Sequence, residues 1–488
     1  MKTKTILSIV LFLTCGIINI QAQVFEVSFS NKTMSEPFSG DVLVYLSKYN
    51  KTPKDVFVGA DLSPVFRVSV KNVKPSEKII FDDKAISYPV VLSDLERGNY
   101  YMQAVFDRNL GGKTMGNSPG NIYSTTKKIK IDKNFEKRIS VLCDQVVPEL
   151  KFVGDDFARE IKFTSELLSK FHEKPIFFTA AIVLPDDYYE SKQSYPVLYK
   201  IMGFGGNYCL PSGTRNVTTI GNKKAIVVHL DGNCPEGHSV YTNSDINGPW
   251  GDAFVQELIP FVNKNYRTDG ASLVTGHSSG GWASLSLQIN YPKAFVGCWA
   301  SAPDYVDFRQ MHAHNIYKPV NLFIDEEGHY IADLTLAGKM PLFKTMDVLR
   351  MEHVICRGEQ YHSFDAVFSK YDENNKIVRL IDVKTGDVNQ KAVPYWKRYD
   401  ISLKLRNNWD FYKDKIGRKI LITVGNQDNF YLNRPIRLME EEMQKINAEV
   451  YFRYFSGDHF TVHSNEAYQK AGMKHLSNCY QNWLKNKK

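Results

Sequence analysis

Hydrophobic and polar residues alternate with a period of two in the first third of the chain, at residues 25–29, 66–70, 100–106 and 139–143. Successive side chains of a β-strand point to opposite faces of its sheet, so each run predicts a strand with one buried face. Gly, Pro, Asn and Asp cluster between the runs, as they do in turns. The pattern therefore predicts an all-β, immunoglobulin-like sandwich over residues 23–147.

The pattern changes from residue 176 onwards, where short, nearly continuous apolar runs alternate with segments of helical periodicity. The expected strands lie at residues 195–202, 225–230, 272–275, 295–300, 419–424 and 449–454. Continuous apolar strands interleaved with helices are typical of a parallel sheet that helices cover on both faces. Apolar residues after Ser464 recur near helical spacing and predict a C-terminal helix. We expect an α/β domain over residues 176–488, joined to the sandwich by a linker at residues 148–175.

Residues 304–415 interrupt this alternation of strands and helices. They are rich in aromatic residues and include a hairpin-like stretch at residues 378–388, whose turn falls at residues 384–387. We interpret the whole segment as a cap that is inserted into the α/β domain.

The N-terminus has the pattern of an export signal. Two lysines precede an apolar run at residues 6–13, and Ala22 offers a cleavage site. The apolar run is too short to span a membrane as a helix, and no later stretch approaches the required length. We therefore expect residues 1–22 to be a signal peptide and the mature protein to be periplasmic or secreted, without lipid attachment at Cys15.

Composition and charge exclude several classes of protein. Hydrophobic residues make up 43% of the 488 and charged residues 23%, which is ordinary for a globular protein and too apolar for a disordered one. The net charge of +8 is small for this length and its basic residues are scattered, so no nucleic acid partner is expected. The cysteines form no CxxC pair, which leaves disulfide pairing open, and nothing in the sequence indicates an oligomeric state.

The strongest chemical signal is the sequence Gly-His-Ser-Ser-Gly at residues 276–280. It directly follows the expected strand at residues 272–275 and precedes a helical segment at residues 282–290, which is the strand–turn–helix context of a nucleophile elbow. Glycines flank the central serine because so sharp a turn leaves no room for side chains two positions before and after it. The motif predicts Ser278 as the nucleophile, with the backbone N–H of Ser279 directed at the developing oxyanion.

A nucleophilic serine needs a base and an acid that orients the base, and in this context both follow the serine along the chain. Asp428 lies just beyond the expected strand at residues 419–424, at the sheet edge that carries the serine, although an aspartate there could also cap a turn. His459 lies on the loop after the strand at residues 449–454, and His463 follows closely as the rival base. Loop position alone favours His459.

A second oxyanion donor is expected from the loop after an earlier strand. Residues 203–206 contain three glycines and directly follow the strand at residues 195–202, so the backbone can approach a substrate closely there. This position assigns the second donor to Phe204 or Gly205.

Other candidate ligand residues carry weaker signals. The two histidines at positions 312 and 314 have no convincing third ligand nearby, so we expect no metal and no organic cofactor. Aromatic residues could line a carbohydrate or aryl pocket, although such residues are more often part of a core. The aromatic candidates are Trp250, Tyr361, Phe364, Tyr395 and Trp396.

Together these motifs resemble a putative esterase family of the α/β-hydrolase fold, the group that contains esterase D and enterobactin-type esterases. The resemblance runs from about Phe177 to the C-terminus. The segments that carry it are residues 195–206, 247–252, 276–281 and 457–459. Residues 425–433 resemble a larger exported subgroup, which has a β-sandwich in front and a long insertion before the acid.

The resemblance implies an α/β-hydrolase fold and a triad of Ser278, Asp428 and His459, since the His of a Gly-x-His loop is the base in that family. His463 aligns where the family usually has an aromatic residue, which implies packing or contact with substrate. Family members often read His-Gly where this chain has Met202 and a glycine. The family spans several ester types and some acyl transferases, so it implies a chemistry but no substrate.

The sequence thus predicts an exported serine carboxylesterase that works through an acyl-enzyme on a small-molecule or glycan-linked ester, with carbohydrate-linked and aryl esters as candidates. An acyltransferase would use the same triad and let an alcohol replace water. A non-catalytic binding protein would require a broken triad, and the triad is complete in this sequence.

Overall fold

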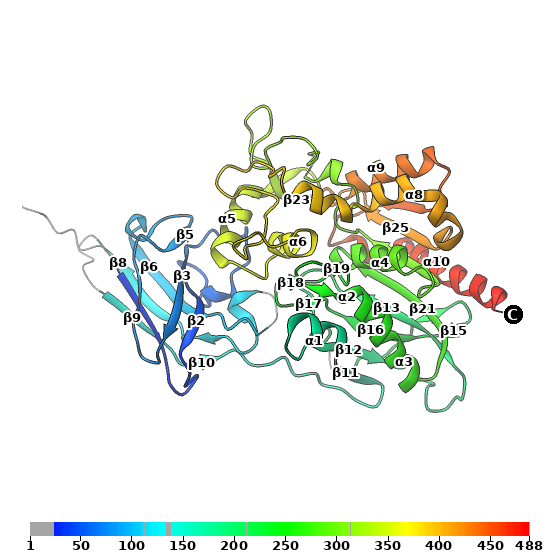
Figure 1. Cartoon of the computed structure of the whole chain (residues 1–488), viewed down its shortest axis with the longest axis horizontal. Coiled ribbons are helices and arrows are strands. Elements are labelled where there is room, and N and C mark those ends of the chain that lie inside the picture. Colours follow the sequence, from blue (N-terminus) through cyan, green and yellow to red (C-terminus); the bar gives the residue numbers. More distant parts are fainter. Residues whose placement is uncertain (1–23, 111–113, 133–137, 210–212, 313, 488) are drawn as a thin grey trace, which may run out of the picture.

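The computed structural model describes residues 24–110, 114–132, 138–209, 213–312 and 314–487 (Figure 1). The predicted signal peptide, residues 1–22, lies outside the described residues. An all-β unit stands at one end of the molecule and a larger α/β unit at the other (Figure 1). In the described ranges no helix is both long and apolar enough to cross a membrane.

Two β-sheets form the N-terminal unit, as the alternating pattern predicts. One sheet has the strand order β4-β1-β9 and the other β10-β7-β6-β2-β3-β5, with β8 paired to β6. The strands are β1 (Val24–Phe29), β2 (Phe38–Ser47), β3 (Val65–Val73), β4 (Ile79–Phe81), β5 (Ile86–Tyr88), β6 (Gly98–Phe106), β7 (Ile122–Tyr123), β8 (Lys127–Ile131), β9 (Arg138–Cys143) and β10 (Gln145–Val146). Phe25, Val27 and Phe29 are buried in a core to which both sheets contribute, so the all-β sandwich is confirmed.

Eight strands in the order β11-β12-β16-β13-β21-β22-β25-β26 form the central sheet of the α/β unit. They are β11 (Ala158–Thr164), β12 (Phe177–Val183), β13 (Tyr195–Ile201), β16 (Ile226–Leu230), β21 (Thr268–His277), β22 (Gly297–Ser301), β25 (Ile420–Gly425) and β26 (Tyr451–Phe455). From β16 to β26 all neighbours pair in parallel, whereas β11 and β12 are antiparallel. The strands expected from the apolar runs are all present, and they form the parallel part of the sheet.

The predicted linker at residues 148–175 is wrong from residue 158 onwards. That part contains β11 and helix α1 (Glu166–His172), and β11 pairs along its whole length with β12. Only Ala158 and Ile161 of β11 are buried. An edge strand has one neighbour and needs few apolar residues, so its sequence shows little of the periodicity that reveals central strands.

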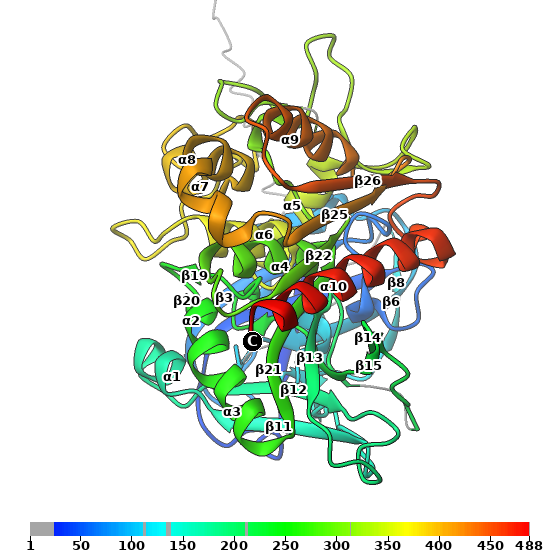
Figure 2. The same ribbon diagram turned by 90° about the vertical axis from the view of Figure 1, so that its right-hand side faces the viewer.

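Helices cover both faces of the central sheet (Figures 1 and 2). They are α2 (Trp250–Ala253), a π-helical turn (Phe254–Leu258), α3 (Ile259–Asn265), α4 (Ser279–Asn290), α8 (Ile401–Ile416), α9 (Asn433–Lys445) and α10 (Glu466–Asn486). Helix α10, the predicted C-terminal helix, crosses one face over β21, β22 and β25 (Figure 2). Neighbouring strand residues divide between two cores: Leu273 packs with the residues of α10, and Val274 with those of α4 on the opposite face.

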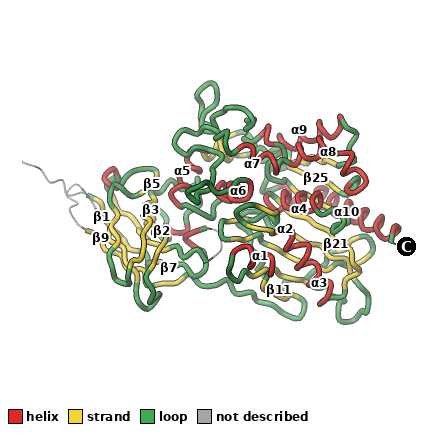
Figure 3. The backbone as a smooth tube through the Cα atoms, viewed as in Figure 1, coloured by secondary structure: helices red, strands yellow, loops and turns green. Residues whose placement is uncertain are grey.

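The chain between β22 and β25 leaves the sheet through long loops (Figure 3). It forms the hairpin of β23 (Ala332–Leu336) and β24 (Met340–Lys344) and the helices α5 (Thr345–Ile355), α6 (Gln360–Phe368) and α7 (Val393–Trp396). The predicted insertion, residues 304–415, ends too late, because it includes nearly all of α8, which packs against α4 and α9 beside the central sheet. The predicted hairpin at residues 378–388 is a single bridge between Ile381 and Val388.

Helix α5 of the insertion joins the two units. Met351, Val354 and Ile355 of α5 form one apolar cluster with Leu43 and Val65 of the sandwich. Burying this surface removes apolar area of both units from water, which favours their association.

A buried ion pair lies at the same junction. Arg357 Nε donates to Asp107 Oδ2 at 2.6 Å, and both side chains are only 6% exposed. Arg357 Nη1 also donates to the carbonyl of Pro235 at 2.7 Å, and Arg67 Nε of β3 donates to the carbonyl of Val354 at 2.8 Å. A charge removed from water is tolerated only while its partner remains in place, so this pair links the sandwich to the α/β unit.

We expect Asp107→Ala to lower the free energy of unfolding by roughly 3–5 kcal/mol, because it leaves the buried Arg357 guanidinium without its counter-ion. Denaturant titration followed by circular dichroism measures the change. Asp94→Ala removes an exposed aspartate of the same unit and should cost less than about 0.5 kcal/mol. Equal losses in the two variants would show that the ion pair does not stabilise the junction.

Candidate active site

Ser278 lies at the turn between β21 and α4. Its backbone has φ 58° and ψ −125°, a conformation that residues other than glycine rarely adopt. Ser278 N donates to the carbonyl of Ser301 at 3.0 Å, which holds the turn at the carboxyl edge of the sheet. The residue is partly exposed, so a substrate can reach it. Backbone strain of this kind is concentrated at functional sites.

Close contacts between backbone segments explain the two glycines of the motif. A Cβ on Gly276 would lie 2.3 Å from the carbonyl oxygen of Gly280, and a Cβ on Gly280 would lie 2.2 Å from the carbonyl oxygen of Ile201. Neither clash could be relieved by rotating a side chain, because the atoms in the way belong to the backbone. The turn therefore requires glycine at both positions.

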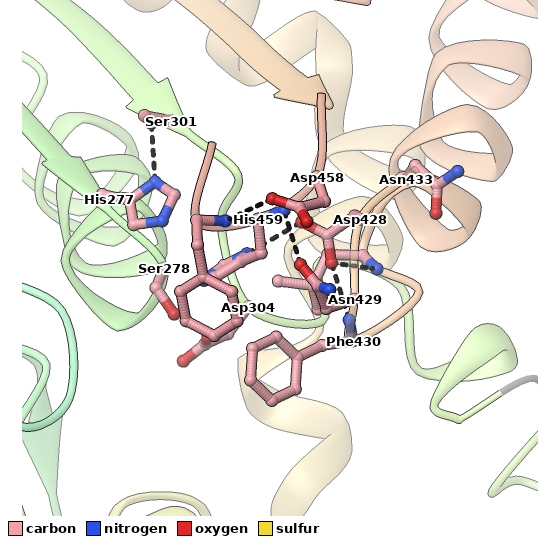
Figure 4. A network of polar contacts seen from close by, with 12 residues as sticks. His277, Ser278, Ser301, Asp304, Asp428, Asn429, Phe430, Asn433, Asp458 and His459 are labelled. Carbon is pink, nitrogen blue, oxygen red and sulfur yellow. Dashed lines mark hydrogen bonds and ion pairs between the residues drawn. The ribbon is translucent and has the colours of Figure 1, made fainter. Parts of the chain in front are cut away.

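His459 and Asp428 meet at the same sheet edge from the loops after β26 and β25 (Figure 4). His459 Nδ1 lies 2.8 Å from Asp428 Oδ2. The other carboxylate oxygen, Asp428 Oδ1, accepts the backbone N–H groups of Phe430 at 3.0 Å and Leu432 at 3.2 Å. With Asp428 ionised, this contact selects the tautomer of His459 that carries its proton on Nδ1 and leaves Nε2 able to accept one.

The backbone of His459 is held by Asn429, to which the sequence reasoning gave no role. His459 N donates to Asn429 Oδ1 at 2.9 Å, and Asn429 Nδ2 donates to the carbonyl of Thr335 at 2.7 Å. Thr335 belongs to β23, so the insertion reaches the site through this side chain. Its position next to Asp428 was the one signal in the sequence that could have drawn attention to Asn429.

A second buried carboxylate, Asp304, was also missed. Asp304 follows β22 and accepts hydrogen bonds from Ser278 Oγ at 3.2 Å and from Ser279 Oγ at 2.6 Å. Burial raises the pKa of Asp304 to about 6, although both serine hydrogen bonds act in the opposite direction. The Ser278 hydroxyl is therefore directed at Asp304 in this structure. The argument that singled out Asp428, an acid just after a parallel strand, applies equally to Asp304.

The glycine-rich loop after β13 lies against the serine. A Cβ on Gly203 would come within 3.2 Å of Ser278 Cβ. Gly206 N donates to the carbonyl of Gly203 at 3.0 Å and closes a tight turn, in which Gly205 has φ 87°. Phe204 and Gly205, the two candidate oxyanion donors, are the central residues of this turn and therefore lie beside Ser278.

Ser279, the other candidate donor, is the first residue of α4. The first N–H groups of an α-helix have no acceptor within the helix, and the helix dipole adds a partial positive charge at this end. Negative charge that develops beside Ser278 is therefore stabilised at the start of α4.

Both candidate bases lie close to the ring of His277. Its ring centroid is 4.4 Å from that of His459 and 4.0 Å from that of His463, and its Nδ1 lies 2.8 Å from Ser301 Oγ. Burial lowers the pKa of His277 well below its ordinary value and also lowers that of His463. Of the two candidates, His459 is the one that Asp428 contacts.

Four of the five aromatic candidates lie in the core, and the fifth, Tyr395, is half-buried. Trp250 is 4% exposed, and its ring centroid is 5.8 Å from that of Phe178 and 5.9 Å from that of Tyr241. Phe364 and Trp396 are buried around a third ring, that of Phe368. Trp250, Phe364 and Trp396 therefore pack in the core. The burial of Trp250 does not support a contact between its side chain and a substrate.

The order of these elements identifies the class of the α/β unit. The serine turn follows one parallel strand, and the acid and the base follow later strands at the same edge, which is the arrangement of an α/β-hydrolase. The family model described as "Putative esterase" matches residues 177–471, more than half of the chain. The chain therefore belongs to the putative esterase family.

Individual proteins resemble this chain either over a short segment or over a longer one at low sequence identity. An esterase of Mycobacterium tuberculosis is 32% identical over 25% of this chain, which spans 28% of the length of that relative. A ferulic acid esterase of known structure is 14% identical over 67% of this chain and 100% of its own, with a TM-score of 0.41. An S-formylglutathione hydrolase from Agrobacterium tumefaciens is also 14% identical, over 67% of this chain and 93% of its own, with a TM-score of 0.37.

We expect Asp304→Asn to be more stable than the wild type at about pH 8, by about 1–3 kcal/mol, and equally stable at about pH 4. Burial raises the pKa of Asp304 from 3.8 in the unfolded chain to about 6 in the folded one, so its ionisation opposes folding. That cost is absent below the lower pKa, grows between the two values and is complete above the higher one. Denaturant unfolding at both pH values measures it, and a difference that does not change with pH would contradict the titration of Asp304.

Proposed function

We propose that the protein is a serine carboxylesterase in which Ser278, His459 and Asp428 form the catalytic triad. The observation that carries this proposal is the 2.8 Å contact between His459 Nδ1 and Asp428 Oδ2 at the sheet edge where the strained Ser278 stands. A serine hydroxyl is a weak nucleophile, and an imidazole whose other nitrogen is fixed by a carboxylate is the base that activates it.

In the first half-reaction, Ser278 Oγ attacks the carbonyl carbon of the ester while His459 Nε2 takes the hydroxyl proton. Asp428 holds the imidazole ring and stabilises its positive charge. The carbonyl oxygen becomes an anion, which the backbone N–H groups of Ser279 and of Phe204 or Gly205 stabilise. The tetrahedral intermediate then collapses: the bond to the alcohol oxygen breaks, and His459 gives its proton to the leaving alcohol.

In the second half-reaction, His459 takes a proton from water, and the hydroxide oxygen attacks the carbonyl carbon of the acyl-enzyme. The bond to Ser278 Oγ breaks, His459 returns the proton to this oxygen, and the carboxylic acid leaves. No other reactant is needed, since water supplies the oxygen and both protons.

The hydrogen bond from Ser278 to Asp304 adds a step before attack. The hydroxyl must turn from the carboxylate of Asp304 toward His459, which breaks a bond of 3.2 Å. A hydrogen bond to a charged group contributes about 1.5–3 kcal/mol, so the turned state is reached readily once substrate supplies new contacts.

The proposed substrates are small-molecule or glycan-linked esters, met outside the cytoplasm after export. The signal-like pattern of residues 1–22 supports export. Assays with a panel of aryl, acetyl-sugar and lactone esters test the substrate class. Product analysis with added alcohols shows whether water or an alcohol receives the acyl group.

We expect Ser278→Ala to reduce kcat/KM for an activated aryl ester by about 10³-fold or more, because only oxyanion stabilisation and substrate binding remain. Steady-state kinetics measure the loss, and circular dichroism checks that the fold is kept. Ser279→Ala removes the neighbouring hydroxyl and keeps the backbone N–H, so this control should retain most of the activity. A fluorophosphonate probe should label the wild type and not Ser278→Ala. The reverse result for the two serines would mean that the elbow has been misassigned.

We expect His459→Ala to cost about as much activity as Ser278→Ala, because the members of a triad act as a unit. Asp428→Asn should cost somewhat less, since it keeps the size of the side chain. His463→Ala is the matched control and should cost far less than either, because His463 is not the histidine that Asp428 contacts. Loss of activity in His463→Ala together with normal rates in His459→Ala would overturn this assignment of the base.

A further inference from the structure

A cavity of about 710 Å³ lies beside the nucleophile, on the face of the central sheet that carries α10. Its floor is formed by β13 and β16, and its walls by residues 214–219 and by Gln469 and Met473 of α10. Between β13 and β16 the chain forms the small ribbon of β14 (Thr219–Ile220) and β15 (Lys223–Lys224) within a long loop. The open space lies over the carboxyl halves of the two strands, since Leu198 and Val227, earlier in the strands, pack with residues of α10.

Strand pairing places a row of polar residues on the floor of this cavity. His229 of β16 is paired with Lys200 of β13, Lys200 with Thr275 of β21, and Thr275 with Trp299 of β22. Paired residues of neighbouring strands point to the same face, and all of these residues line the cavity. Two residues earlier in β13, Leu198 belongs to the apolar core under α10. The polar row therefore lies at the carboxyl ends of the strands, where the catalytic residues stand.

The lining of the cavity is basic. It includes Lys200, Arg215, His229, His277 and His463. Of the residues that the structure places around the cavity, none is an aspartate or a glutamate.

The ammonium group of Lys200 stands out among these groups. Arg215 already pairs with Asp155 at 2.6 Å, whereas Lys200 Nζ has no hydrogen bond or ion pair with any described residue. Burial, and after it the charge of Lys200, lowers the pKa of His229 to about 4. The Lys200 side chain is exposed at the cavity, so its charge is available to a bound anion.

Two residues join the cavity to the proposed catalytic site. Gly203 lines the cavity and also lies against Ser278, and His277 lines it and directly precedes Ser278. The ring of His277 contacts those of His459 and His463. A group bound in the cavity would thus lie next to two residues that adjoin Ser278.

We propose that this cavity binds an anionic oxygen group, a carboxylate above all, through the ammonium of Lys200 and the ring N–H groups of His229 and His463. The neutral imidazoles each supply one donor, and Lys200 supplies the charge. The anion is either a carboxylate within the ester that Ser278 cleaves or a separate small anion. The first alternative rests on the proposed function.

The first arm of the test compares two esters on the full-length enzyme: 4-nitrophenyl hexanoate, which is neutral, and 4-nitrophenyl hydrogen adipate, which ends in a carboxylate. Lys200→Met keeps the length of the side chain and removes its charge. The ratio of kcat/KM for the anionic ester to kcat/KM for the neutral ester should fall at least fivefold in Lys200→Met. The same ratio should also fall in His229→Gln. Lys264→Met, on exposed α3, is the control and should leave the ratio unchanged.

The second arm uses free adipate and inorganic phosphate, titrated calorimetrically into the wild type and into Lys200→Met. Binding that is lost in Lys200→Met, without a change in the ester ratio, assigns the cavity to a separate anion. An unchanged ratio together with equal or absent binding in the two proteins overturns the proposal. If the wild type hydrolyses neither ester, the proposed function fails, and the calorimetric arm still decides whether the cavity binds an anion. Thermal melts check the fold of each variant.

Discussion

The contact between the backbones of Gly280 and Ile201 is the constraint on which the rest of the site depends. The chain turns so sharply after β21 that the start of α4 lies against the end of the neighbouring strand β13, where a single Cβ would come within 2.2 Å of a carbonyl oxygen. This approach fixes Ser278 in its strained conformation at the sheet edge and sets the glycine loop after β13 beside it. Parallel pairing then brings the ends of β22, β25 and β26 to the same edge, with Asp304, Asp428 and His459 on the loops that follow.

Two carboxylates at this edge differ because their partners differ. Asp428 is fixed by an imidazole and two backbone N–H groups. Asp304 has two serine hydroxyls and is otherwise enclosed by the protein, so burial outweighs its hydrogen bonds and raises its pKa to about 6. A carboxyl group whose pKa is raised by burial is typical of sites that transfer protons. Asp428 thus holds the base, and Asp304 is an acid that titrates next to the nucleophile.

The features that the sequence predicts well are those with local signals. The elbow has its own glycine spacing, the central strands are continuous apolar runs, and Asp428 and His459 follow the ends of two such strands. Features that depend on contacts between distant segments could not be predicted.

Examples of such distant contacts run through the fold and the site. Strand β11 is recognisable by its pairing with β12, and Asn429 gains its function from a hydrogen bond to His459. Trp250 is a residue whose role the sequence leaves open, because a tryptophan side chain suits a pocket and a core equally well. Its packing against Phe178 places it in the core.

The insertion explains how a sandwich without catalytic groups can still affect the site. On one side, α5 shares an apolar cluster with the sandwich, next to the buried pair of Arg357 and Asp107. On the other side, Thr335 of the same insertion accepts the hydrogen bond of Asn429, whose side chain holds the backbone of His459. The sandwich thus contacts the insertion at the junction, and the insertion in turn positions the loop of His459. Weakening the junction would therefore act on the order of the loop that carries His459, and the chemistry of a correctly placed triad would be unchanged.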